Sequence, residues 1–172
     1  MSNQVPKPDF MTDQAWKALM AGRRHESIRD NSVNHVKRYL DSNGAEGTYI
    51  TQGGPTLVLA TIGRKSGDER LSVVNFMPLG EDVAVVGSIA GLDKPPHWAL
   101  NLEQTPRGWI QIKGDRWDVT ARKITGTERE ALWPELTAFF PLWGHFQKYC
   151  DREFSVFILS RADGSGSRSG KS

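Results

Sequence analysis

The sequence has little of several features that define common protein classes. Its 172 residues contain one cysteine, Cys150, which excludes an intrachain disulfide and a disulfide-stapled secreted scaffold. No apolar run approaches the length of a membrane-spanning helix. The first ten residues are polar and include two prolines, a pattern unlike that of a signal peptide. We therefore expect a cytoplasmic protein.

The usual sequence signs of a metal centre or of a serine nucleophile are also absent. The four histidines are far apart, with neither a His-Glu-x-x-His pair nor a Cys-His cluster. There is no Gly-x-Ser-x-Gly elbow, and Cys150 is expected to be a packed residue rather than a nucleophile. The sequence therefore indicates neither a catalytic metal nor a serine hydrolase.

The overall charge is ordinary. The chain has 22 Lys and Arg against 20 Asp and Glu, a net charge of +2, which argues against a polyanion-coating protein. Cations and aromatic residues are not interleaved on one strand face, so nucleic-acid binding is not expected. The cations near the N-terminus suit a solvated helix face, and peripheral membrane contact through an N-terminal helix is the alternative.

The order of the expected elements predicts a mainly β fold. Two helices, Gln14–Ala21 and Glu26–Leu40, form an N-terminal arm over residues 1–46. Consecutive hairpins without strand–helix–strand alternation then predict an antiparallel barrel with flanking helices over residues 47–160, before a flexible Gly/Ser tail over 161–172. The expected strands are Tyr49–Thr51, Thr56–Ile62, Leu71–Leu79, Val83–Ser88, Gly108–Lys113, Arg116–Ile124 and Phe154–Leu159.

Two further helical segments are expected within the barrel domain. A short helix covers His97–Glu103, with Pro96 tolerated in its first turn. A longer helix is capped by Thr125 or Thr127, and residues 127–130 form a capping box in which Glu130 reaches back to the cap. Its prolines should divide this second helix into two pieces.

The turn between the strands Thr56–Ile62 and Leu71–Leu79 concentrates positive charge. Its glycines leave backbone N–H groups uncovered, and its cations are charge-assisted donors. It is not a Walker loop, because a strand follows it instead of a helix. We predict an anion site, with a solvated hairpin tip as the alternative. The residues of this basic turn are Gly63, Arg64, Lys65, Ser66, Gly67 and Arg70.

Aromatic residues are dense near the C-terminal end of the barrel domain. Core packing accounts for most of them, but a flat, aromatic-lined ligand wall is also credible. His97 and His145 are possible acids or bases, although a lone histidine is more often a packing or surface residue. The aromatic residues are Phe139, Phe140, Trp143, Phe146 and Tyr149, with Trp98 in the short helix.

Four segments keep the order and spacing of motifs in one known family. They are Thr61–Arg70, Ser88–Gly91, Pro96–Leu102 and Asp151–Glu153. Together, over about Gly47 to Leu159, the chain resembles the deazaflavin (coenzyme F420)-dependent nitroreductases, split β-barrel flavin and deazaflavin oxidoreductases. The resemblance implies a six-to-seven-stranded antiparallel split β-barrel of the FMN-binding type, with an N-terminal helical arm.

The resemblance also implies a cofactor site for coenzyme F420, with FMN as the alternative. The basic turn would hold the phosphate and acidic tail of the deazaflavin. Ser88, Ile89, Ala90 and Gly91 would place backbone groups and one hydroxyl near the ring edge, and Trp98 would line the ring pocket. Hydride would pass from the reduced ring to an electron-poor small molecule.

The chain departs from the family pattern on both sides of this site. Ile89 replaces a family lysine and Ala90 a glycine. On the substrate side Asn75 replaces an aromatic residue, while Phe140, Trp143 and Phe146 replace tyrosines, so we expect these four to bind substrate. The catalytic candidates are Ser88, Asn75, His145 and Tyr149.

The expected function is therefore F420-dependent reduction of a quinone, an activated alkene or a nitro compound. The protein would act as a monomer or a homodimer. A non-catalytic flavin, lipid or haem binding protein of the same fold is the alternative, as is an FMN-dependent reductase.

Overall fold

The computed structural model describes residues 4–49, 54–162 and 168–169. The predicted helices and strands within these ranges are confirmed, with small shifts at their ends. The helices are α1 (Asp13–Ala21), α2 (His25–Asp41), α3 (His97–Gln104), α4 (Gly126–Phe139) and α5 (Pro141–Lys148), with a 3-10 turn η1 (Ile89–Gly91). The strands are β1 (Thr56–Ile62), β2 (Glu69–Leu79), β3 (Asp82–Val86), β4 (Arg107–Ile112), β5 (Asp115–Ile124), β6 (Val156–Arg161) and β7 (Arg168–Ser169).

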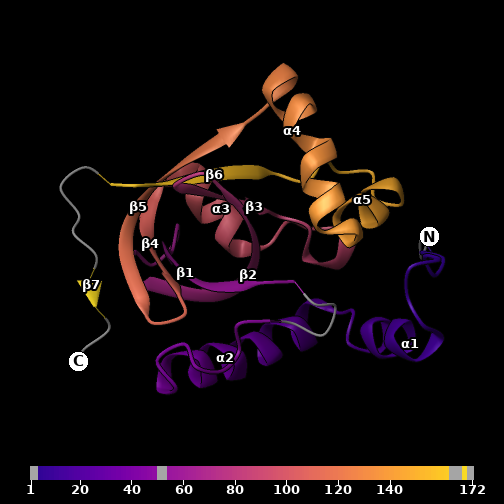
Figure 1. Ribbon diagram of the computed structural model, residues 1–172, viewed down its shortest axis with the longest axis horizontal. Helices are drawn as coiled ribbons and strands as arrows, with labels where there is room; N and C mark the ends of the chain where they lie inside the picture. The colour runs from indigo at the N-terminus through magenta and orange to yellow at the C-terminus, as the bar shows by residue number, and fades with distance from the viewer. Residues whose placement is uncertain (1–3, 50–53, 163–167, 170–172) are drawn as a thin grey trace.

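Six antiparallel strands close into a barrel, which confirms the predicted fold class. Their order is β4-β1-β2-β3-β6-β5, and pairing of β4 with β5 closes the circle. In Figure 1, α1 and α2 run along the side of the barrel that carries β1 and β2, whereas α4 and α5 lie on another side. The tail adds the two-residue β7, which pairs with β5. Of the predicted strand Tyr49–Thr51, only Tyr49 lies within the described residues, in an isolated bridge to Pro55.

The alternation of apolar residues along the strands builds two cores. One set of alternating side chains, including Leu57, Leu59 and Ile110, is fully buried inside the barrel, where α3 adds Trp98 and Leu102. The opposite face of β3, β5 and β6 packs against α4 and α5. Successive residues of a strand point to opposite faces, so β1, β3 and β6, which are buried on both faces, have nearly continuous apolar sequences.

The start of α4 differs from the prediction. The helix begins at Gly126, two residues before the start that the predicted capping box at Thr127 and Glu130 implies, so this box is wrong. Thr125, the other predicted cap, does precede the helix, although its side chain makes no capping hydrogen bond. Gly126, with φ of +58°, turns the chain into the helix there. The division into two pieces is confirmed, because α4 ends and α5 starts at Phe140–Pro141. None of the helices that the structure describes is long and apolar enough to cross a bilayer.

The helix α2 is anchored to the barrel through its C-terminal half. Val36 and Tyr39 are its buried residues. The Tyr39 hydroxyl lies 3.1 Å from the carbonyl oxygen of Thr56 and accepts a hydrogen bond of 2.8 Å from the N–H of Lys113. Burial raises the pKa of this hydroxyl, so it stays protonated. The first two turns of α2 bury no residue, which leaves space between them and β2.

Replacing Gly108 by alanine should destabilise the barrel. A Cβ at this position in β4 would lie 1.9 Å from the carbonyl oxygen of Ala60 in β1, so the strands would have to separate. We expect a loss of about 1–3 kcal/mol in the free energy of unfolding, measured by urea denaturation. Gly114→Ala is the matched control, because its Cβ would have an ordinary contact of 3.5 Å with Asn43. Equal stability of the two variants would contradict the predicted clash.

Candidate active site

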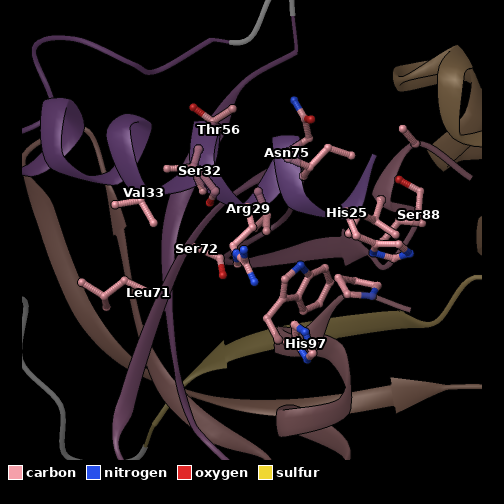
Figure 2. Close-up of a pocket in the computed structure, with 18 of the residues that line it drawn as sticks. His25, Arg29, Ser32, Val33, Thr56, Leu71, Ser72, Asn75, Ser88 and His97 are labelled. Carbon is pink, nitrogen blue, oxygen red and sulfur yellow. The ribbon is translucent and has the colours of Figure 1, made fainter. Parts of the chain in front are cut away.

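A cavity of about 660 Å³ lies between α2 and β2. From α2, side chains such as His25, Arg29 and Ser32 face it, and β2 contributes the consecutive residues Leu71–Asn75. The remaining wall comes from the ends of β1 and β3, the η1 turn, the start of α3, and Trp143 of α5. Figure 2 shows the labelled side chains of these segments around the cavity. Its size and its mixture of apolar and polar groups suit an organic cofactor with a small substrate.

The η1 turn has an unusual backbone. Three consecutive residues, Ile89, Ala90 and Gly91, have φ of 41°, 52° and 66°. The left-handed region is unfavourable for residues with a Cβ, so Ile89 and Ala90 are held there by their surroundings. Backbone strain of this kind is concentrated at ligand sites in proteins.

Two arginines hold this turn through its carbonyl groups. Arg152 donates hydrogen bonds of 2.9, 2.6 and 2.8 Å to the carbonyl oxygens of Gly87, Ser88 and Leu92. Arg23, between α1 and α2, donates bonds of 2.7 and 3.0 Å to the carbonyl oxygens of Ala90 and Gly91. With its carbonyls bound on the far side, the turn presents Ser88, Ile89 and Ala90 to the cavity.

The basic turn adjoins the mouth of the cavity. The backbone N–H and the guanidinium of Arg64 both donate to the Oδ1 atom of the buried Asn101, at 3.2 and 2.9 Å. Asn101 in turn donates to Thr61, so helix α3 fixes the conformation of the turn. A second guanidinium nitrogen of Arg64 lies 3.3 Å from His97, which lines the cavity. The cationic turn and the cavity are therefore adjacent.

Positively charged side chains surround His97 at the mouth of the cavity. Partial burial, followed by the charges of Arg64, His25, Lys65 and Arg29, lowers the pKa of His97. Its imidazole is therefore neutral at neutral pH and accepts a hydrogen bond from Arg64. His97 is consequently placed to orient Arg64 rather than to act as an acid.

The structure brings together many of the predicted site residues. Asn75, Ser88, Ile89, Ala90 and Trp98 all line the cavity, as does Trp143. The basic turn, with Gly63, Arg64, Lys65, Ser66, Gly67 and Arg70, lies beside its mouth through the Arg64–His97 contact. Gly91 is buried behind the turn that it ends.

Other predicted site residues do not line the cavity. The Nε2 atom of His145 is 2.6 Å from the carbonyl oxygen of Pro6, and its ring contacts Tyr149. Neither His145 nor Tyr149 is among the residues that line the cavity. Phe140 and Phe146 are buried in the core under α5 and do not line it either. These four side chains were expected at the site because they follow the family order, but α5 directs them into the contact with the N-terminal arm and into the core.

Several residues of the site were not predicted from the sequence. From the sequence, the cations near the N-terminus are expected on a solvated helix face. In the structure Arg29 lines the cavity and Arg23 binds the η1 turn. His25 and Ser32 were also missed. A sequence feature that could have indicated these residues is the interrupted apolar stripe of α2, because a helix face that covers a ligand cavity need not be apolar.

The closed antiparallel barrel, the cavity walled by tryptophan and β2, and the cationic turn beside it are the features of a split β-barrel protein with a pocket for an organic cofactor. The model of the F420H(2)-dependent quinone reductase family matches residues 31–161, and the chain belongs to this family. An F420H(2)-dependent quinone reductase from Mycobacterium tuberculosis is 30% identical over 130 residues, which cover 74% of this chain and 87% of that protein.

Solved structures support the same assignment. An F420H2-dependent reductase has a TM-score of 0.57 and 31% identity, over 62% of this chain and 94% of that one. A structure described as a domain-swapped dimer has a TM-score of 0.59 and 28% identity, over 74% of this chain and 96% of that one.

Proposed function

We propose that this protein is an F420H2-dependent reductase that transfers hydride from the reduced deazaflavin to a quinone. The observation that carries the proposal is the continuity between an aromatic-walled cavity and a cationic turn. A deazaflavin has a flat, largely apolar ring system and an anionic tail, so it requires these two environments side by side. The family assignment supports the same cofactor and acceptor.

The residues of the site fit such a cofactor. The apolar residues of the half-buried segment Leu71–Asn75 and the indole of Trp98 offer apolar surfaces to a ring. Ser88 and the backbone of Ile89 and Ala90 offer polar groups at its edge. Lys65 and Arg70 extend from the basic turn as donors for phosphate or carboxylate oxygens.

When bound, the reduced deazaflavin supplies a hydride. The chain supplies orientation and charge stabilisation. We assign to Ser88 and Asn75, two polar residues of the cavity wall, the hydrogen bonds to a quinone oxygen, where negative charge develops as hydride arrives. Trp143 encloses the acceptor and limits the access of water.

The acceptor preference can be tested in a steady-state assay. The protein, reduced F420 and one acceptor at a time are mixed, and oxidation of the deazaflavin is followed by absorbance. A soluble naphthoquinone should be reduced faster than a nitroaromatic or an enone at the same concentration. Rates equal to those without protein for all three acceptors would contradict the proposal and favour a non-catalytic binding protein.

A further inference from the structure

The helix α2 carries polar residues on a face that lines the cavity, and packing against the barrel does not account for them. His25, Arg29 and Ser32 are spaced by three or four residues, which places them on one side of a helix. All three line the cavity, yet none is buried. A helix that packed directly on the barrel would present apolar residues here, as it does further on at Val36 and Tyr39.

This part of α2 is held in place at both ends of the cavity. Towards the C-terminus, Tyr39 hydrogen-bonds to the barrel. At the N-terminus, Arg23 binds the η1 turn and His25 lies 3.2 Å from Asp93. The face with Arg29 is therefore fixed over the cavity with space below it, which suits a wall of a ligand site.

The charges of this wall continue those of the basic turn. Arg29 lines the cavity together with His97, and His97 contacts Arg64. The carboxylates nearby are Asp30, 3.7 Å from Arg29 at the surface, and Glu26, which also lines the cavity. Asp93 faces His25. Arg29 thus adds a permanent positive charge to the mouth at which Arg64 and Lys65 already lie.

We propose that Arg29 is an anion-binding residue that α2 contributes to the cofactor site, where it contacts the phosphate or carboxylates of the deazaflavin tail opposite the basic turn. This inference rests on the proposed function. A guanidinium binds phosphate and carboxylate oxygens well because it offers paired donors in one plane. A neutral quinone offers no such partner, so the tail suits Arg29 better than the acceptor does. Arg29 also supplies a charge to the same cavity that Ile89, another of its lining residues, does not.

The test compares two ligands and two variants. Arg29→Gln removes the charge at the cavity, and Arg38→Gln removes a charge from the same helix at an exposed position outside it. Dissociation constants are measured by fluorescence for oxidised F420 and for the deazaflavin riboside that lacks the phosphate and the acidic tail. Circular dichroism confirms that both variants are folded.

Arg29→Gln should weaken F420 binding by about 3- to 10-fold, with a shallower salt dependence, and leave riboside binding unchanged. Arg38→Gln should match the wild type with both ligands. If the wild type binds F420 and Arg29→Gln binds it equally well, or loses both ligands equally, the assignment of Arg29 to the tail is overturned while the proposed function stands. If the wild type binds neither ligand, both are overturned.

Discussion

Replacing Arg64 and Lys65 together by alanine should weaken the binding of coenzyme F420 by about 30- to 1,000-fold, which corresponds to roughly 2–4 kcal/mol for two charge-assisted contacts at a partly exposed site. The physical reason is the loss of two of the cations that stand at the cavity mouth. Isothermal titration calorimetry at two salt concentrations would measure the effect, and the dependence on salt should decrease in the variant.

The chain offers a matched control for this variant. Arg122 and Lys123 are also adjacent, but they lie on β5 and pair with Glu128 and Glu103 at the surface. Their replacement by alanine should leave F420 binding unchanged, since such surface pairs contribute little.

The two cations of the turn have different roles. Arg64 also holds Asn101, whereas Lys65 has an exposed side chain. The single variant Lys65→Ala therefore separates charge from the structure of the turn. An unchanged dissociation constant in the Arg64 and Lys65 double variant would refute the anion site.

Replacing Arg152 by alanine should destabilise the protein by about 2–4 kcal/mol. The change removes the guanidinium donors to the carbonyl oxygens of Gly87, Ser88 and Leu92, of which Ser88 keeps a hydrogen bond from the N–H of Gly91. These bonds hold a turn whose backbone is strained, so the turn should relax and lose its shape at the cavity. Urea unfolding measures the stability, and F420 titration measures the effect on the site.

Arg152→Lys provides the comparison for this variant. It keeps the positive charge, but its ammonium group is a point donor and cannot reproduce the planar set of donors that binds three carbonyls. We expect an intermediate loss of stability. If Arg152→Ala unfolds within about 0.5 kcal/mol of the wild type, the arginine does not hold the turn in the way described.

The sequence predicted those parts of the site that depend on local chemistry. The basic turn is contiguous, so its glycines and cations could be interpreted together before any contact was known. The η1 turn and Trp98 were predicted through the resemblance, because their motifs keep the spacing of the family. The barrel followed from the alternation of apolar residues and from the hairpins.

The rest of the site depends on contacts between distant segments. Arg29 precedes the basic turn by more than thirty residues in the sequence, and no periodicity indicates that the two lie at one cavity. The interrupted stripe of α2 indicated weak packing, whereas the structure shows that this face covers a cavity. The prediction for His145 rested on its position among the aromatic residues. In the structure the N-terminal arm contacts this histidine, which does not line the cavity.

The predicted capping box at Thr127 and Glu130 does not form, and the reason is local. The pattern Thr127-Glu128-Arg129-Glu130 fits a helix start, but Gly126, in the left-handed region, already lets the chain enter the helix two residues earlier. Glu128 then pairs with Arg122 on β5, and Arg129 donates to the carbonyl oxygen of Phe154. Tertiary contacts of the first turn thus determined the helix start.

The central claim is that the cavity between α2 and β2 holds a deazaflavin. A binding screen of the wild-type protein with F420, FMN and FAD tests it most directly, with ligand fluorescence and the emission of tryptophans such as Trp98 as the readouts. F420 should bind at micromolar concentration or tighter and quench the tryptophan emission, and FMN and FAD in excess should not displace it. Tighter binding of FMN or FAD, or no binding of F420, would contradict the account.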